Sequence, residues 1–257
     1  MITSSSNSKI KHVRALSRRK ERHAARQFVV EGVRLVEEAV QAKIIPAFVL
    51  HTSSVEDDQR AQALLEELRA VTQVLAVSDA VMKEISNTET PQGVLAVVPF
   101  IELALPTPPQ FVLILDAVRD PGNVGTIMRS ARAAGVDELL FAPGTADPYN
   151  DKVVRSAMGA HFFVPFRALS RWREITEMTK MMPRIYLADA HGDVDYAHAD
   201  WSRPVALIVG GEAEGASDTA HSAKIAAVRV SIPMLGGTES LNAAMAATVL
   251  LFQAARA

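Results

Sequence analysis

Residues 111–129 read Phe111-Val-Leu-Ile-Leu115, an apolar run, followed by Asp116-Ala-Val-Arg-Asp-Pro-Gly-Asn-Val-Gly-Thr-Ile-Met-Arg129. An apolar run without alternation is typical of a strand that is buried on both faces of a parallel sheet. Asp-Pro-Gly favours a turn, and Asn123 is a good N-cap for a helix that we expect over 123–134, closed by Gly135. This stretch therefore predicts a strand, a polar loop and a helix of an α/β domain.

Two later strands end in the same way. Val205-Ala-Leu-Ile-Val209 leads into Gly210-Gly-Glu-Ala-Glu-Gly215, and a strand expected over 227–232 leads into Ile232-Pro-Met-Leu-Gly-Gly237. A helix follows over 239–255, for which Thr238 or Ser240 would be the cap. Ligands of such sheets bind beyond the carboxyl ends of the strands. The three loops therefore predict one binding site at that edge of a mostly parallel sheet flanked by helices.

The rest of the chain also alternates between strands and helices. After residue 110 we expect further strands over 138–142, 162–166 and 184–189, and helices over 151–159 and 171–181. Before residue 100 we expect helices over 8–26, 33–40, 56–71 and 79–85, and strands over 27–31, 47–50, 74–77 and 93–98. Four prolines between Pro99 and Pro109 interrupt the pattern, because proline continues neither a helix nor a sheet ladder. We therefore expect a small N-terminal α/β domain over 1–100, a proline-rich linker over 101–109, and a second domain over 110–257.

The composition excludes several classes of protein. The 257 residues include no cysteine, so disulfides and thiolate metal sites are ruled out. The seven histidines are scattered, and we expect no metal. No apolar run approaches the length of a membrane span, and the N-terminus lacks the apolar block of a secretory signal. We therefore expect a cytoplasmic protein without a membrane partner.

The overall net charge of −2 hides an asymmetry. Residues 1–30 contain eight Lys and Arg and one acid, so the remainder of the chain sums to −9. A basic segment on an acidic chain favours a polyanion such as RNA, although a solvated basic helix without a partner has the same composition. The candidate RNA contacts are Lys9, Lys11, Arg14, Arg18, Arg19, Lys20, Arg22 and Arg26.

The three loops also restrict the ligand. Gly210 and Gly211 let the backbone approach a ligand closely, but Glu212 and Glu214 would repel a pyrophosphate, which disfavours a dinucleotide. Hydroxyl groups or a positive centre fit better. Ile232, Met234 and Leu241 could pack in the core, form an apolar slot for an adenine ring, or do both.

The first loop and the last helix each leave alternatives open. Asn123 and Arg129 could together hold a phosphate or a ribose hydroxyl, or Asn123 could only cap its helix. The helix over 239–255 is apolar almost all round, which is typical of core burial; a dimer interface is the alternative.

In this order, the three segments resemble the three motifs of the SpoU/TrmH family of RNA ribose 2′-O-methyltransferases, within the SPOUT superfamily. The first resembles Asp-x-x-x-Asp-Pro-x-Asn-x-Gly…Arg, the second Gly-x-Glu-x-x-Gly, and the third Ile-Pro-Met-x-Gly…Ser-Leu-Asn. The matching residues are Asp116, Asp120, Pro121, Asn123, Gly125 and Arg129, then Gly210, Glu212 and Gly215, then Ile232, Pro233, Met234, Gly236, Ser240, Leu241 and Asn242.

The N-terminal part is similar to the substrate-binding domain of that family, a small α/β module like certain ribosomal proteins. The matching stretches are Asn7–His12, Phe28–Gly32 and Pro91–Gly93. One departure concerns the third motif, which the family often continues with Val-Ser, whereas this chain reads Asn242-Ala-Ala-Met.

The resemblance implies a deep trefoil knot in the C-terminal domain, S-adenosylmethionine bound in the knot loops, and a homodimer formed through that domain. Carried over by position, the cofactor contacts would be Gly210, Gly211, Ile232, Met234 and Leu241. The catalytic cluster would be Asn123, Arg129, Glu212, Ser240 and Asn242.

The function we expect is methyl transfer from S-adenosylmethionine to a ribose 2′-hydroxyl of structured RNA, with 23S ribosomal RNA ahead of transfer RNA. The alternatives are a transfer RNA 2′-O-methyltransferase, a base methyltransferase, and a non-catalytic RNA-binding protein that keeps the fold. Methyl incorporation into RNA distinguishes an enzyme from the last of these.

Overall fold

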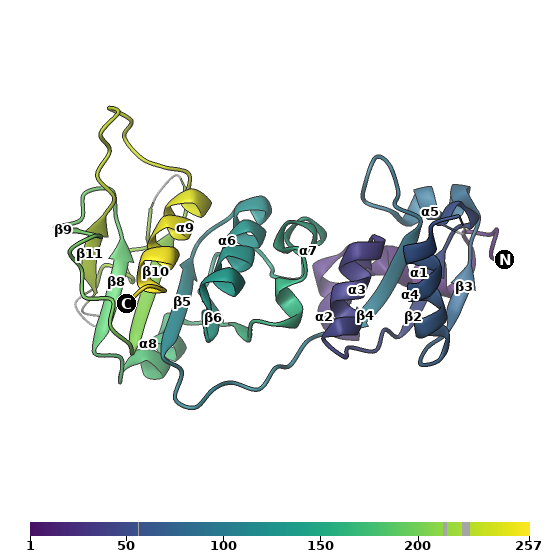
Figure 1. Ribbon diagram of the computed structural model, residues 1–257, viewed down its shortest axis with the longest axis horizontal. Coiled ribbons are helices and arrows are strands. Elements are labelled where there is room, and N and C mark those ends of the chain that lie inside the picture. Colours follow the sequence, from purple (N-terminus) through teal and green to yellow (C-terminus); the bar gives the residue numbers. More distant parts are fainter. Residues whose placement is uncertain (56, 213–214, 223–226) are drawn as a thin grey trace. The chain divides into compact units, whose positions relative to one another are not determined.

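The computed structural model describes residues 1–55, 57–212, 215–222 and 227–257 of the chain (Figure 1). It divides into two compact units. Unit 1 comprises Met1–Ile101 and Tyr149–Phe162, and unit 2 comprises Glu102–Pro148 and Phe163–Ala257. The proline-rich stretch thus begins at the first division between them.

Unit 1 contains a four-stranded sheet with helices on both faces. Its strands are β1 (Gln27–Glu31), β2 (Phe48–His51), β3 (Val74–Ala76) and β4 (Val94–Pro99), in the order β1-β4-β2-β3. β4 runs antiparallel to β1 and β2, whereas β3 runs parallel to β2. Its helices are α1 (Ser8–Leu16), α2 (Arg19–Ala25), α3 (Val33–Gln41), α4 (Gln59–Arg69), α5 (Asp79–Ile85) and α7 (Asp151–Ala157), with short 3-10 turns at Ser53–Val55 and Ala160–Phe162.

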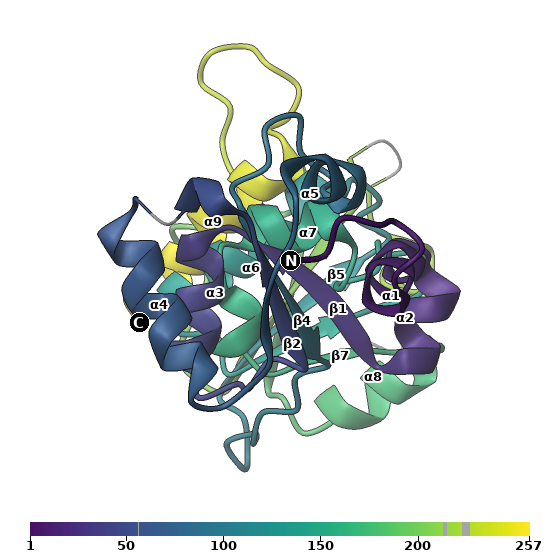
Figure 2. The ribbon, with the colours of Figure 1, turned by 90° about the vertical axis from the view of Figure 1, so that its right-hand side faces the viewer.

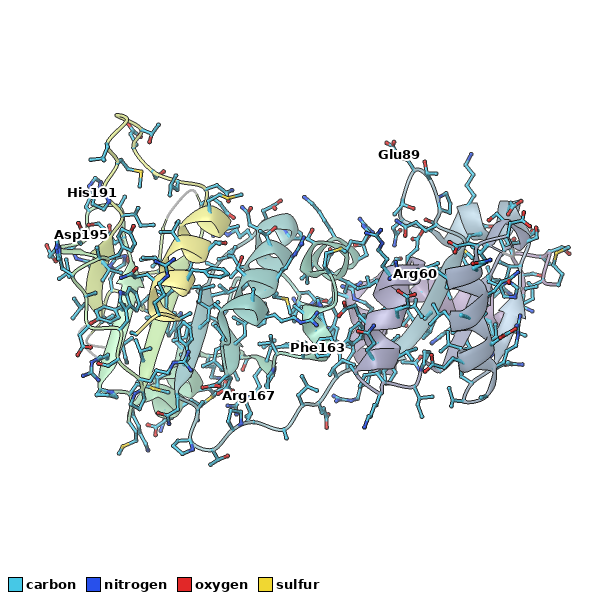
Figure 3. The ribbon with its side chains drawn as sticks, viewed as in Figure 1. Arg60, Glu89, Phe163, Arg167, His191 and Asp195 are labelled. Carbon is cyan, nitrogen blue, oxygen red and sulfur yellow. The ribbon has the colours of Figure 1, made fainter. Side chains whose placement is uncertain are left out.

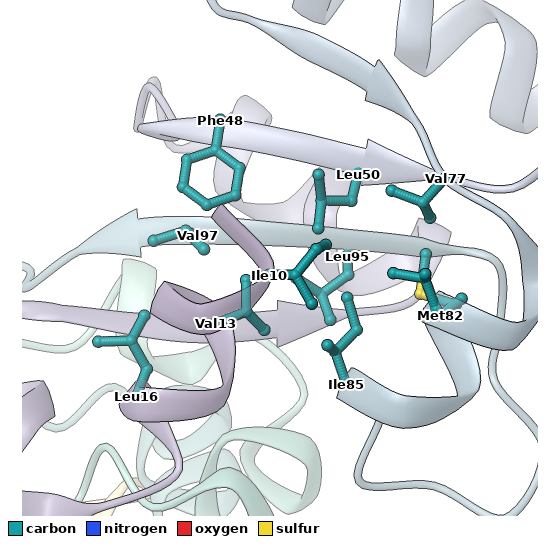
Figure 4. Packing of buried hydrophobic residues seen from close by; sticks show 11 residues of the cluster. Ile10, Val13, Leu16, Phe48, Leu50, Val77, Met82, Ile85, Leu95 and Val97 are labelled. Carbon is teal, nitrogen blue, oxygen red and sulfur yellow. The ribbon is translucent and has the colours of Figure 1, made fainter. Parts of the chain in front are cut away.

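Side-chain alternation along the strands of unit 1 separates two layers of core. Leu50 and Leu95 face α1 and α5, where they pack with the apolar side of α1 (Figure 4). The neighbouring strand residues point to the opposite face, which α3 and α4 cover (Figure 2). Because the strand period is two, each strand contributes to both layers.

The helix expected over 8–26 is two helices. α1 ends at Leu16 and α2 begins at Arg19, with the chain turning at Ser17 and Arg18. Arg22 explains the break, because its Nη1 donates to the carbonyl oxygens of Leu16 at 3.0 Å and Ser17 at 2.7 Å. These carbonyls at the end of α1 would otherwise lack helical partners. The prediction of one continuous helix was therefore wrong.

The segment Tyr149–Phe162 completes the core of unit 1. Tyr149 stacks on Phe100 with ring centroids 3.7 Å apart, and its hydroxyl accepts a hydrogen bond from the amide of Ile101 at 3.0 Å. Phe28 packs against both Tyr149 and Phe162. The strand expected over 162–166 is absent: Ala160–Phe162 forms a 3-10 turn, and the strand begins only at Phe166.

Unit 2 contains a seven-stranded sheet whose ladders are all parallel in the part of the chain that the structure describes. The strand order is β7-β6-β5-β10-β8-β11-β9. The strands are β5 (Phe111–Asp116), β6 (Glu138–Phe141), β7 (Phe166–Ala168), β8 (Arg184–Ala188), β9 (Val194–Asp195), β10 (Val205–Gly210) and β11 (Val228–Ser231). The predicted parallel sheet is therefore confirmed, with β9 as an edge strand that the pattern did not predict.

Helices cover both faces of this sheet. α8 (Trp172–Thr179) packs through Ile175 on one face, against Ile114, Leu140 and Ile208. α6 (Pro121–Ala134) and α9 (Ala243–Ala254) lie side by side on the other (Figure 1). Among the helices in the described ranges, none combines the length and apolar composition needed to cross a membrane.

α9 has both a core face and an exposed face. Ala247, Leu250 and Leu251 are fully buried, whereas Met245 is 56% and Phe252 45% exposed. The helix begins at Ala243 rather than near residue 239, because Asn242 is its cap. The two interpretations of this apolar helix are therefore compatible: one face packs in the core, and the other leaves apolar surface uncovered.

Candidate active site

The three loops predicted to form one site meet at the carboxyl edge of the unit 2 sheet. β5 and β10 are neighbours in register, so that Asp116 and Gly210, their last residues, lie opposite each other. The second loop spans residues 213 and 214, so Glu214 lies outside the described residues. The third loop runs from Ile232 to Asn242 and extends beyond the strands before α9 begins (Figure 1).

The side chain of Asp116 links three segments at this edge of the sheet by hydrogen bonds. Its carboxylate is fully buried, and it accepts hydrogen bonds from the amide of Ser217 at 2.6 Å and the indole Nε1 of Trp172 at 3.2 Å. A buried carboxylate is stable only when hydrogen-bonded in this way. Asp116 thus fixes the chain after the second loop relative to β5.

Asp120, and not Asn123, caps α6. The Oδ1 of Asp120 accepts from the amide of Asn123 at 2.9 Å, and Pro121 occupies the first turn. The expectation that Asn123 is the cap was wrong for this reason. The consequence is chemical, because the carboxamide of Asn123 is left available to other groups.

Asn123 connects the first loop to the other two. Its Nδ2 donates to Glu212 Oε1 at 2.5 Å, and its Oδ1 accepts from Asn242 Nδ2 at 3.2 Å. The Oδ1 of Asn242 caps α9 by accepting from the amides of Ala244 and Met245. A hydrogen-bonded chain Glu212–Asn123–Asn242 therefore joins three of the five predicted catalytic residues, one from each motif.

Arg129 and Ser240 lie outside this chain of hydrogen bonds. Arg129 is exposed on α6, and within the described ranges no hydrogen bond or ion pair joins it to Glu212 or Asn123. Ser240 is exposed on the third loop and lines the cavity described next.

A cavity of about 430 Å³ opens between the second and third loops. All five predicted cofactor contacts line it: Gly210, Gly211, Ile232, Met234 and Leu241. Glu212 and Ser240 also line it, whereas Asn123, Arg129 and Asn242 do not. A volume of this order suits a single small ligand.

The glycines at the entrance to the second loop are required by close backbone packing. A Cβ on Gly210 would lie 2.3 Å from the amide nitrogen of Ala216, and one on Gly211 would lie 2.5 Å from the carbonyl oxygen of Ala117. Ala117 itself adopts a left-handed conformation with φ 54°. Glycine at these two positions thus lets the backbone at residues 210–211 pack closely against the backbone at Ala216 and at Ala117.

Part of the lining was missed by sequence reasoning. Ala188 ends β8, and Asp189, Ala190 and His191 follow it. His221 and Glu239 also line the cavity; His191 is labelled in Figure 3. Because β8 pairs with β10, its carboxyl end reaches the same edge. The polar residues after the strand expected over 184–189 were the signal that could have found them.

The charged groups of the cavity wall are acidic. Asp189, Glu212 and Glu239 line it, and in the described ranges no Lys or Arg does. Asp189 lies 3.6 Å from Arg229 outside the wall. The pKa of Arg229 is raised, first by its hydrogen bond to Asp193 and then by the nearby carboxylate charges. A cation is therefore better accommodated here than a phosphate.

Comparison with known proteins identifies the family. The profile described as the SpoU rRNA Methylase family matches residues 110–252. The chain belongs to this SpoU family. A second profile, the MRM3-like substrate binding domain, matches residues 7–96.

Relatives of the SpoU family match along nearly the whole chain. The 23S rRNA (guanosine(2553)-2′-O)-methyltransferase RlmP of Bacillus subtilis (strain 168) is 36% identical, over 98% of this chain and 97% of its own length. The 23S rRNA (uridine(2479)-2′-O)-methyltransferase of Streptomyces viridochromogenes is 34% identical, over 94% of this chain and 86% of its own length.

Solved methyltransferase structures have the same fold. The methyltransferase AviRb from Streptomyces viridochromogenes, in complex with the cofactor AdoMet, superposes with a TM-score of 0.87 at 32% identity, covering 97% of each chain. The AdoMet-bound rRNA methyltransferase from Sinorhizobium meliloti gives 0.85 at 29% identity, covering 99% of this chain and 97% of its own.

The basic residues predicted to contact RNA occupy different positions in unit 1 of this SpoU protein. Lys11, Arg14, Arg18 and Arg22 line a second cavity. Lys9 and Arg26 lie over the rings of Phe48 and Phe100, at 4.3 and 5.7 Å from the ring centroids. The remaining two, Arg19 and Lys20, are exposed on α2.

Arg22 differs from the other seven because it is only 4% exposed and its guanidinium serves the end of α1. A buried guanidinium that holds backbone carbonyls is unavailable to a phosphate in solution. We therefore remove Arg22 from the candidate RNA contacts and assign it a structural role.

Proposed function

We propose that this SpoU protein transfers a methyl group from S-adenosylmethionine to a ribose 2′-hydroxyl of ribosomal RNA, 23S rRNA above all. The observation that carries the proposal is the pairing of an acidic cavity, lined by the predicted cofactor contacts, with the Glu212–Asn123–Asn242 chain at its edge. The names of the two bacterial relatives support the same reaction and the same RNA.

The cavity fits S-adenosylmethionine. Ile232, Met234 and Leu241 supply apolar surface for an adenine ring, and the backbone at Gly210 and Gly211 can meet polar edges. The carboxylates in the wall favour a positive centre and disfavour a pyrophosphate. When bound, this cofactor supplies an electrophilic methyl group on a cationic sulfur.

The residues around the cavity have separate tasks in this reaction. The exposed Arg129 guanidinium holds an RNA phosphate and stabilises negative charge that develops on the attacking oxygen. Asn123 orients the ribose, and it is itself held in one amide orientation by Glu212 and Asn242. Fixed orientation of the acceptor supplies much of the rate of such a bimolecular step.

The proposal extends to the assembly. The exposed apolar residues Met245 and Phe252 on α9 support a homodimer through unit 2, since an isolated chain would leave them in water. The path from β11 back to α9, which packs on α6 beside the central strands, supports the deep trefoil knot. An experimental chain trace and a measurement of mass in solution test these two points.

Further parts of the proposal concern organisation and place. We retain a substrate-binding domain over 1–100 with a ribosomal-protein-like fold, a linker over 101–109 and a methyltransferase domain over 110–257, supported by the two profile matches. RNA contact by the basic N-terminal segment, without Arg22, is supported by its charge. We also propose a cytoplasmic location, independence of metal, and rRNA ahead of transfer RNA; the names of the two bacterial relatives support the choice of rRNA.

The deciding experiment incubates the purified chain with radiolabelled S-adenosylmethionine and rRNA, then digests the product. An alkali-resistant dinucleotide with the label on the ribose is expected, and label on a base or none at all contradicts the proposal. Arg129→Ala is expected to lower kcat by about 10²–10³ while leaving the cofactor Kd within about twofold, because Arg129 does not line the cavity. Equal loss of both would point to a structural role.

A further inference from the structure

Unit 1 contains a cavity of about 530 Å³ that the methyl-transfer site does not use. Its walls come from α1, the turn into α2, the end of α5, Asn87 and the segment at Tyr149–Asp151. Four of its lining residues are basic: Lys11, Arg14, Arg18 and Arg22. We call this hollow the basic groove.

The four basic residues are not equivalent. Arg22 is buried and holds the end of α1, and Arg14 pairs with Glu84 at 2.9 Å. Arg18 is 70% exposed and lies only within 3.9 Å of Glu21, a long contact. Lys11 is exposed, and in the described part of the chain no carboxylate lies within ion-pair distance of it. Lys11 and Arg18 are therefore the cations that can take up an external anion.

Other lining residues of the basic groove have groups that can hydrogen-bond to the edge of a base. Asn87 is exposed and offers one acceptor and two donor hydrogens from the same planar amide. The carboxylates of Glu84 and Asp151 line the groove as acceptors, each also paired to an arginine. Amides and carboxylates are the side chains that recognise base edges in nucleic acids.

The basic groove and the methyl-transfer cavity differ in the charges of the residues that line them. Acidic residues line the cavity in unit 2, and its described lining contains no Lys or Arg. The groove instead has two exposed cations, Lys11 and Arg18, beside neutral and acidic hydrogen-bonding groups. A single nucleotide carries both features that the groove matches, a phosphate and a polar base edge. The volume suits a ligand of that size.

We propose that the basic groove binds one nucleotide of the RNA other than the methylated one, with its phosphate against Lys11 and Arg18 and its base edge against Asn87. The proposal rests on the proposed function for the identity of the RNA. It assigns part of the choice of substrate sequence to a site in unit 1, since phosphate contacts position an RNA and base contacts select it.

The phosphate half of the proposal is tested by fluorescence anisotropy of the full chain with a short, fluorescein-labelled single-stranded RNA of mixed sequence. The double variant Lys11→Ala/Arg18→Ala is expected to bind about tenfold more weakly at low salt and to lower the slope of log K against log salt by about 0.7, the value for one phosphate contact on a single strand. The matched control Arg34→Ala/Arg69→Ala removes the same charge from exposed positions of unit 1 outside the groove, and it should stay within about twofold of wild type.

The base-reading half is tested with labelled homopolymers of adenosine, cytidine and uridine. Asn87→Ala is expected to reduce the spread of affinities among the three RNAs while changing their mean little. Unchanged preferences in Asn87→Ala, or equal losses in the groove and control double variants, would overturn the proposal. The circular dichroism spectrum and the urea unfolding curve should be the same in all variants as in wild type, which shows that unit 1 keeps its fold.

The two proposals fail in different ways. If the wild-type chain methylates rRNA on the ribose but the groove variants bind RNA normally, only the groove assignment is lost. If the wild-type chain transfers no methyl group while the groove variants still lose RNA affinity, the proposed function is lost and the binding site remains.

Discussion

The carboxamide of Asn242 makes two kinds of contact, and Asn242→Asp separates them. The oxygen that caps α9 is kept, whereas the NH2 group that donates to Asn123 Oδ1 at 3.2 Å becomes a second oxygen. An N-cap contributes about 1 kcal/mol, and a carboxylate at a helix N-terminus adds about 0.3–1 kcal/mol. Loss of the hydrogen bond costs about 1 kcal/mol. The cap itself is kept, and the gain from the carboxylate nearly cancels the loss of the hydrogen bond, so the free energy of unfolding should change by less than about 1 kcal/mol.

The effect on Asn123 does not cancel. In the wild-type chain its Nδ2 faces Glu212 and its Oδ1 faces Asn242. With a carboxylate at 242, the present orientation brings two oxygens together, and a flipped amide brings Oδ1 toward Glu212 instead. Asn123 therefore has to move whichever way it turns. A displacement of about 1 Å of an orienting group can lower a rate about a hundredfold, so we expect kcat to fall by between about 10-fold and about 100-fold.

The assay compares Asn242→Asp with Asn242→Ala and wild type in single-turnover methyl transfer, alongside urea unfolding. Asn242→Ala loses the cap and the hydrogen bond together, so it should lose about 2 kcal/mol of stability as well as activity. Asn242→Asp should lose activity alone, with the cofactor Kd unchanged. A stable Asn242→Asp chain with kcat within about twofold of wild type would refute the reasoning.

Three further results follow from the structure. Arg22→Met should lower the free energy of unfolding by about 1–3 kcal/mol, because two carbonyls at the end of α1 lose their donor. If the variant instead kept its stability and changed the salt dependence of RNA binding, Arg22 would be an RNA contact after all. Gly210→Ala should weaken cofactor binding at least tenfold by calorimetry, about 1.4 kcal/mol or more, because its Cβ would meet backbone 2.3 Å away; normal affinity would show that the loop can shift. Hydrogen bonds from Ser202, chiefly from its hydroxyl, lower the pKa of Asp200 from 3.8 to about 2. The folded-state pKa is therefore below the unfolded one, so this contribution is present above pH 3.8 and is lost as pH falls through about 2. In Asp200→Ala, unfolding free energies should depend less on pH in that window, and an unchanged pH profile would exclude the contact.

The pattern of apolar residues correctly predicted the central strands β5 and β10. Phe111–Leu115 and Val205–Val209 are apolar throughout because both faces of β5 and β10 are covered, and they pair in parallel. The rule that ligands bind at the carboxyl ends of such strands then located the cavity. The resemblance to the SpoU/TrmH motifs supplied five of its lining residues.

Which of several neighbouring residues caps a helix was harder to predict from the sequence, although one signal was present for α6. Asp120 and Asn123 both suit an N-cap, but Pro121 follows Asp120, and proline favours the first helical position. The structure uses Asp120. At the start of α9, Thr238, Ser240 and Asn242 all suit the position; the structure uses Asn242, which also donates to Asn123.

Charge counting could not separate cations that bind RNA from cations that hold the fold. Arg22 and Arg18 are four residues apart in one basic segment, yet one is buried and the other is 70% exposed. That difference arises from the turn at Ser17, which depends on Arg22 itself and on the packing of α1 against the sheet. A helical pattern running through 8–26 contains no sign of it.

The order in which a ribosome adds residues has a particular consequence for unit 1. Its first strand carries Phe28, which packs against Tyr149 and Phe162, but residues 102–148, all belonging to the other unit, are synthesised in between. The aromatic surface at Phe28 therefore stays partly uncovered on the nascent chain until residue 162 has left the exit tunnel. A polypeptide cut at residue 101 would keep that surface permanently open, and it should be prone to aggregation.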